Sequence, residues 1–201
     1  MVRALAASES RNSNGLDQFC TSLEERPGLS ILDFAGASQA TVSFITDYGH
    51  RLYSDDFVHQ LDKCFGGPGD FYENQSNPLL ASRFLEAAMD FDEQSFDGAL
   101  VWDALQFMTP SLLQAVVARL QRTLRPGSSL FAVFHADERI DEIPTWSYRI
   151  QDRRTVVMTH RSTRRPAQMF NNRNLEKLFQ DFSSVKFFLT RDHLREVLVR
   201  R

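Results

Sequence analysis

The chain has few of the residues that mark several common kinds of site. It carries only two cysteines in 201 residues, Cys20 and Cys64, and they form no metal-binding pattern, so we expect no metal. Two free thiols are typical of a reducing compartment. No apolar run approaches the roughly 20 residues of a membrane-spanning helix, and the first residues lack the apolar core of a signal peptide. These absences predict a cytoplasmic protein with no membrane partner.

An excess of positive charge is also missing. The formal net charge is -3 and the sequence pI is about 6.0. No global basic field is therefore available to attract nucleic acid, although a local basic patch is compatible with these values. Hydrophobic residues make up 42% of the chain, which is enough for one domain with a full core.

Glycine is scarce where a nucleotide-binding turn would need it. The stretch LSILDFAGASQATVSFITDYGHRLYSDD, residues 29–56, has the pattern of a strand, a tight turn, a helix and a second strand that ends in two acids. The turn itself, DFAGAS, contains the single glycine Gly36. The layout of a nucleotide-binding unit is present, but the close backbone approach that glycine allows is reduced.

The order of the expected elements predicts an α/β fold. Strands alternate with helices up to a fifth strand in SSLFAVFH, and two strands without an intervening helix close the chain, which indicates an antiparallel last strand. We expect a doubly wound, mostly parallel seven-stranded sheet with a β-hairpin inserted after the fifth strand. Residues 79–91 are either a helix throughout or a helix that enters the third strand. The predicted organisation is a frayed tail and short helix in 1–28, one domain in 29–201, and the hairpin in 145–165.

Three motifs together resemble the class I, Rossmann-like S-adenosylmethionine-dependent methyltransferases. They are ILDFAGAS, FDEQSFDGALVWDALQFM and LQRTLRPGSSLFAVF, and they occur in the order and at the separation typical of that family. The first is degenerate. The resemblance covers roughly residues 29–201. It implies a methyltransferase that uses S-adenosyl-L-methionine and transfers its methyl group to an unidentified acceptor.

The resemblance also implies where the cofactor would bind. The three glycine positions of the first motif hold Ala35, Ala37 and Gln39, and alanine would lose roughly 1–2 kcal/mol if it had to adopt a positive φ. The cofactor-binding residues that the family pattern assigns near the first two strands are Asp33, Ala35, Gly36, Ala37, Asp55 and Asp56. Asp33 has an equally good interpretation as an acid that organises the turn.

An acid at the end of the second strand commonly accepts hydrogen bonds from the ribose hydroxyls. Asp55 is favoured for this role by its in-line position, whereas Asp56 suits a cap for the helix that follows. The adenine pocket is expected around Glu86, Asp90 and Phe91, with a register uncertain by a residue or two. Phe91 also fits a core position.

Two strand ends carry the candidate catalytic residues. Trp102 and Asp103 end the fourth strand, and His135 ends the fifth. Asp103 and His135 are candidate general bases for methyl transfer, which depends mostly on positioning and desolvation. Trp102 is a candidate lid on the cofactor. The alternatives are simple packing for Trp102 and a structural role for His135.

The hairpin region is rich in arginine. Its arginines are Arg149, Arg153, Arg154, Arg161, Arg164 and Arg165, with Arg173 just beyond. A solvated hairpin face explains them. The functional alternative is a cap over the active site that binds an anionic substrate or an RNA phosphate. Nucleic acid is only weakly supported, because the aromatic residues here are limited to Trp146 and Tyr148, and a small-molecule substrate is equally compatible.

Two functions remain open at this level. One is an active methyltransferase that binds its cofactor through an eroded first motif. The other is a catalytically inactive methyltransferase-like domain that serves as a partner-binding or scaffold protein. Fold analogy alone does not separate them.

Overall fold

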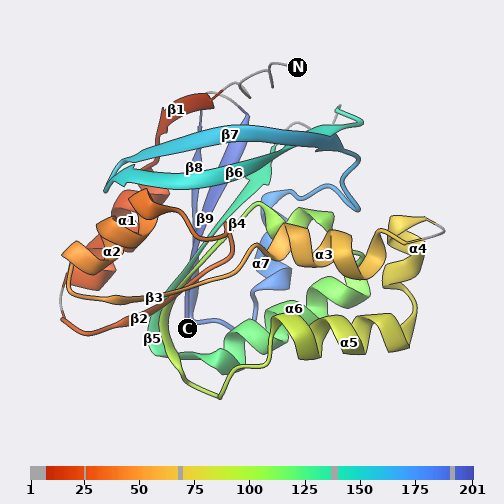
Figure 1. The fold of residues 1–201 in the computed structure, drawn as a ribbon, viewed down its shortest axis with the longest axis horizontal. Helices are drawn as coiled ribbons and strands as arrows, with labels where there is room; N and C mark the ends of the chain where they lie inside the picture. Colours follow the sequence, from red (N-terminus) through yellow and green to blue (C-terminus); the bar gives the residue numbers. More distant parts are fainter. Residues whose placement is uncertain (1–7, 25, 68–69, 137–139, 191–192) are drawn as a thin grey trace.

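The computed structural model describes residues 8–24, 26–67, 70–136, 140–190 and 193–201. Its main sheet has six strands in the order β3-β2-β4-β5-β9-β8 (Figure 1). The first four are parallel, and β9 runs antiparallel to both β5 and β8. The bounds are β2 Ser30–Asp33, β3 Arg51–Ser54, β4 Phe96–Trp102, β5 Leu124–His135, β8 Ser184–Leu189 and β9 Leu194–Arg200.

The sheet has one strand fewer than the sequence analysis expected. Residues 79–88 belong to helix α5 (Pro78–Ala88), and residues 89–91 form a connection and no third parallel strand. Asn77 begins this helix by accepting hydrogen bonds from the N–H groups of Leu79 and Leu80, and Pro78 suits its first turn. Phe84 and Ala88, four residues apart, bury one face. The strand β3 is therefore left at the edge of the sheet.

Helices cover both faces of the sheet (Figure 1). Successive residues of β2 point to opposite faces: Ile31 packs in the cluster that includes α1 and α2, and Leu32 packs in the cluster of the other helices. The helices are α1 Asn14–Glu24, α2 Gln39–Asp47, α3 Phe57–Phe65, α4 Phe71–Gln75, α5, α6 Pro110–Thr123 and α7 Asn172–Leu178, with a short 3-10 helix at Ala104–Phe107. Among the helices of the described residues, none is long and apolar enough to cross a membrane.

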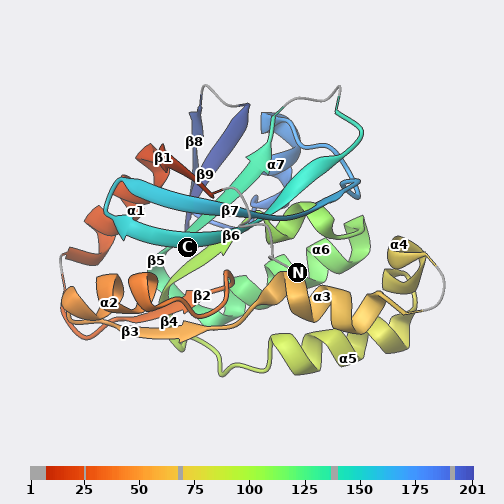
Figure 2. The ribbon, with the colours of Figure 1, turned by 45° about the horizontal axis from the view of Figure 1, so that its top comes forward.

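A second, smaller sheet lies across the end of the main sheet (Figure 2). Its strands are β1 Ser8–Asn12, β7 Thr155–Arg164 and β6 Ile143–Asp152, all antiparallel and in that spatial order. The strand β1 corrects the expectation of a frayed tail for residues 8–12; the rest of that expectation, residues 1–7, lies outside the described residues. The sequence of β1, SESRN, has no apolar alternation that would predict a strand. The strand is held instead by backbone pairing with β7 and by an ion pair between Arg11 and Glu196 at 3.0 Å.

Candidate functional site

The turn after β2 crosses to the end of β3. The N–H of Gly36 donates to the carbonyl of Asp55 over 3.1 Å, and Ala35 forms a bridge with Asp56. Gly36 has φ +84°, and a Cβ there would lie 3.2 Å from the Cβ of Asp56. Glycine is therefore required at this one position, both by conformation and by space.

The three glycine positions of the family motif, which hold Ala35, Ala37 and Gln39, are filled without a positive φ. Among the described residues other than glycine, a positive φ occurs at Gln94, Trp102 and His193. Ala35 and Ala37 thus avoid the loss of roughly 1–2 kcal/mol that a positive φ would cause for alanine, and Ala37 is exposed. The backbone of this turn therefore accommodates alanine at both positions.

Trp102 lies over this turn from the end of β4. Its indole N–H donates to Oδ1 of Asp33 over 2.6 Å. Its ring stacks on Tyr148 of β6, with centroids 4.7 Å apart and planes 10° apart, and meets Phe131 edge-on at 5.6 Å. The residue has φ +55°, which is uncommon for a bulky side chain and points to a constrained site. The indole is 2% exposed.

Asp33 is sealed beneath Trp102. It is 0% exposed, and its oxygens accept hydrogen bonds from Trp102, from the N–H of Ala35 at 3.1 Å and from the hydroxyl of Ser54 at 3.3 Å. Burial raises the pKa of this carboxyl to about 6, and the three hydrogen bonds oppose the rise. The acid organises the turn, as the sequence alternative proposed, and presents no surface to a ligand.

Asp103 is a second buried acid beside the first. Burial raises its pKa to about 7, against the lowering effect of hydrogen bonds from Tyr148 and the backbone of Trp146, and of the nearby positive charge of Arg161. Its Oδ2 atom has no hydrogen-bond partner among the described residues. A carboxyl with this pKa has the proton affinity of a general base, but it is 3% exposed, behind the hairpin.

The two acids after β3 have different roles. Asp56 caps α3 by accepting from the N–H of His59 at 3.0 Å, and it pairs with Arg161 of β7 at 2.8 Å. Asp55 instead lines a groove of about 160 Å3 whose other residues are Leu32, Tyr53, Ser54, Ala87, Ala88, Asp90 and Phe91. The structure therefore brings Asp55 and Phe91 together, as the adenosine site expected from the family pattern requires.

The remaining candidates lie apart from this groove. Glu86 is on the exposed face of α5, where it accepts from the hydroxyl of Ser82 at 3.0 Å, and it is not among the groove residues. His135 is at the end of β5, half-buried, and its backbone N–H donates to Gln106 at 3.0 Å.

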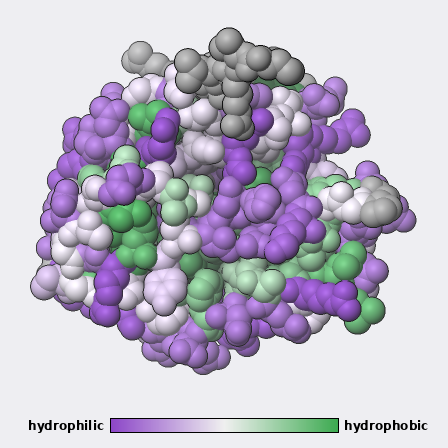
Figure 3. All heavy atoms as spheres, in the orientation of Figure 1, coloured by the Kyte–Doolittle hydropathy of each residue, from purple (hydrophilic) through white to green (hydrophobic). Residues whose placement is uncertain are grey.

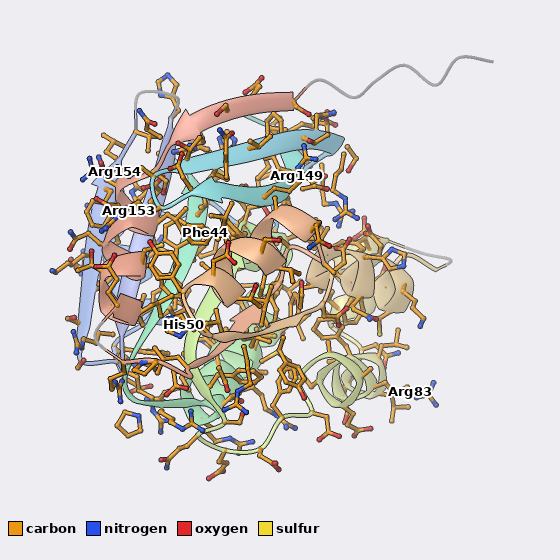
Figure 4. All side chains as sticks on the ribbon, turned by 60° about the vertical axis from the view of Figure 1, so that its left-hand side comes forward. Phe44, His50, Arg83, Arg149, Arg153 and Arg154 are labelled. Carbon is orange, nitrogen blue, oxygen red and sulfur yellow. The ribbon has the colours of Figure 1, made fainter. Side chains whose placement is uncertain are left out.

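The hairpin is fixed over the site by its own arginines. Arg161 pairs with Asp56 and Arg164 with Asp62 of α3. At the turn between the strands, Arg153 and Arg154, both labelled in Figure 4, pair with Asp17 of α1 at 2.5 and 2.7 Å. The pairs themselves are not marked there. Four of the seven arginines in this region therefore form ion pairs within the chain, and Arg149 donates to the hydroxyl of Thr159 at 3.0 Å, which leaves fewer for an anionic ligand.

Two hairpin residues contribute most to the site and were not singled out for it by the sequence. They are Tyr148, which stacks on Trp102, and Arg161, which ties the hairpin to α3. The sequence feature that could have indicated a role for Tyr148 is the Trp-x-Tyr pair in the first hairpin strand, because aromatic rings tend to pack against an apolar surface. The sequence does not say which surface that is.

The crevice at the ends of β2 and β4 is closed in this structure. Family members place the amino-acid end of the cofactor against the first-motif acid and turn. Here the indole of Trp102 donates to this acid, the ring of Tyr148 stacks on the indole, and Asp33 has no exposed surface. The small groove at Asp55 is open on the side expected for adenosine.

Comparison with solved structures identifies the fold. A protein from Pyrococcus horikoshii OT3 is 14% identical, with 92% of this chain and 87% of that chain covered and a TM-score of 0.52. An S-adenosylmethionine-dependent methyltransferase from Methanosarcina mazei is 17% identical, with 88% and 93% covered and a TM-score of 0.50. No protein-family model and no curated protein matches the chain. The resemblance to class I methyltransferases is thus confirmed for the fold.

Proposed function

We propose that this chain is a methyltransferase-fold binding domain that does not use S-adenosylmethionine. The observation that carries the proposal is the hydrogen bond between the Trp102 indole and Asp33, made by two side chains that are 2% and 0% exposed. The atoms that would meet the cofactor are paired with each other instead. This favours the partner-binding alternative that the degenerate motif raised.

The hairpin supports the same conclusion. A ligand entering the crevice would have to part Tyr148 from Trp102 and disturb the ion pair of Arg161 with Asp56. A closed crevice lowers the apparent affinity for a ligand, because only the fraction of molecules in the open form can bind it.

A thermal-shift titration with S-adenosylhomocysteine tests the proposal. A ligand at 100 times its dissociation constant stabilises a protein by about 2.7 kcal/mol. We expect no shift at millimolar ligand. A saturable shift that Asp55→Ala weakens would contradict the proposal.

The second candidate is a methyltransferase whose hairpin opens before the cofactor binds. It is favoured by the groove that joins Asp55 with Asp90 and Phe91, where adenosine is expected, and by the fold of the Methanosarcina mazei enzyme. Asp103 and His135 would then be the candidate bases for an anionic or small-molecule acceptor. In that case Arg161→Ala, which loosens the hairpin, should tighten S-adenosylhomocysteine binding.

A further inference from the structure

The absence of the expected third strand leaves one edge of the main sheet without a partner strand among the described residues. That edge is the outer side of β3. The N–H groups of Arg51 and Asp55 donate to the carbonyls of Leu29 and Asp33 on the β2 side. Because backbone groups alternate along a strand, the N–H and C=O groups of Leu52 and Ser54 point outward from the sheet.

The side chains on this edge form an unusual surface. Arg51, Tyr53 and Asp55 project from the same face because they are two residues apart. Tyr53 is 61% exposed, one of few large hydrophobic side chains so placed. Its ring is supported from below by Phe96 at 5.5 Å, and the groove that contains Phe91 opens beside it. The face seen in Figure 3 is mostly polar, with apolar areas between the polar ones.

The sequence of the edge is complementary to itself. If a second copy is laid antiparallel with the two-fold axis at Tyr53, Leu52 faces Ser54 of the copy, and Arg51 faces Asp55 of the copy. The outward groups of Leu52 and Ser54 then form a hydrogen-bonded pair on each side of the axis, and the two Tyr53 rings meet at the axis. The opposite charges come directly across from each other, in the closely spaced type of pair.

The charges are available for this contact. Neither Arg51 nor Asp55 forms an ion pair with another residue in the described part of the chain. Among the described residues, the hydrogen bonds of their side chains are long: the guanidinium of Arg51 donates to the carbonyl of Gly28, and the carboxylate of Asp55 accepts from the side-chain amide of Gln60, all at 3.4 Å.

We propose that β3 is a dimerisation edge, at which two copies of this chain join their main sheets antiparallel about Tyr53. A symmetric contact between identical patches is the commonest way in which soluble chains associate. The contact involves a short strand, so the dimer is weak and depends on concentration. The proposal does not depend on whether the crevice binds a cofactor.

Charge exchange at the edge tests this proposal by sedimentation velocity, over about two orders of magnitude in protein concentration. The wild-type chain should pass from monomer to dimer. Arg51→Asp places two acids opposite each other on both sides of the axis, and Asp55→Arg places two bases there. Each single variant should therefore remain monomeric at concentrations where the wild type is a dimer.

The two single variants also provide their own rescue. An equimolar mixture of Arg51→Asp and Asp55→Arg restores opposite charges on both sides of the axis, so the mixture should form a heterodimer, and the double variant should form a homodimer. Recovery in the mixture also shows that both variants are folded. Lys186→Asp, on the exposed face of β8 at the other edge of the sheet, makes the same change of charge as Arg51→Asp and should dimerise like the wild type.

Two results would overturn the proposal. One is a wild-type chain that stays monomeric throughout the concentration series. The other is a dimer that the single variants do not weaken, since its contact would then lie elsewhere on the molecule.

Discussion

The indole N–H of Trp102 donates to the carboxyl of Asp33 over 2.6 Å and so joins the end of β4 to the end of β2. In an open α/β sheet the crevice at these strand ends is where ligands bind. Here Trp102 and Asp33, on the two sides of the crevice, are hydrogen-bonded to each other. The stability of this contact can be measured separately from any ligand.

Replacement of Trp102 should show how the contact is built. Trp102→Phe keeps an aromatic ring but removes the N–H, so a buried carboxyl loses a donor, and the free energy of unfolding should fall by about 1–3 kcal/mol. Trp102→Ala also leaves a cavity and should lower it by about 3–5 kcal/mol. Urea unfolding measures both. Trp146→Phe, at a partly buried position, is the matched control and should change less. A Trp102→Phe variant as stable as the wild type would contradict the assigned role.

Gly36 should tolerate alanine poorly. The positive φ alone costs about 1–2 kcal/mol, and the new Cβ would lie 3.2 Å from the Cβ of Asp56. Gly28→Ala is the control, because Gly28 has φ +76° but no atom within 4 Å of the added Cβ. Gly36→Ala should therefore be the more destabilising of the two in urea. Equal losses would mean that the turn moves away from Asp56 at no cost.

The buried Asp103 should make stability depend on pH. Its folded-state pKa, about 7, is above the ordinary value, so the folded state binds more protons than the unfolded state. Its contribution to stability is present in full below about pH 4 and is lost as the pH rises to about 7.

Asp103→Asn removes this titration and keeps a side chain of the same shape. The variant should gain stability relative to the wild type as the pH rises across that window, by up to a few kcal/mol. Asp33 titrates in both proteins and so does not alter the comparison. Denaturation midpoints measured at several pH values test this, and parallel profiles would count against a raised pKa at Asp103.

The ion pair of Arg161 with Asp56 should restrain the hairpin more than it stabilises the fold. Both side chains are about one-third exposed, 29% and 32%, so a double-mutant cycle of Arg161→Ala with Asp56→Asn should give a coupling of at most about 1 kcal/mol. The asparagine retains the capping oxygen for α3. Amide exchange in β6 and β7 should nevertheless become faster in Arg161→Ala. Arg165→Ala, at an exposed position nearby, should leave exchange unchanged.

Regular elements with strong local signals could be predicted from the sequence. Between two prolines, the sequence predicts a helix with an apolar stripe of Leu112, Leu113, Val116, Val117, Leu120 and Leu124. The first five are buried in α6, together with Thr123, whereas Leu124 begins β5. The third strand could not be resolved, because its short apolar segment suits a helix or a strand by pattern alone. The N-terminal strand β1 gave no signal, since its order comes from pairing with distant residues of β7.

The closed crevice could not be predicted for a similar reason. The motif showed that glycines were missing, and Trp102 was noted as a lid or a packed residue. Which of the two it is depends on Tyr148, which is 46 residues away in the chain and contacts Trp102 only through the placement of the hairpin. Local patterns carry no information about such a contact.

The most direct test of the central claim is the NMR signal of the Trp102 indole. The chain has two tryptophans, so ¹⁵N-labelled tryptophan gives two indole N–H signals, and Trp146→Phe assigns them. A buried N–H bonded to a carboxyl should exchange slowly with water, and the signal should stay in place when S-adenosylmethionine is added to millimolar concentration. A Trp102 signal that exchanges fast, or that moves saturably with the cofactor, would contradict the account.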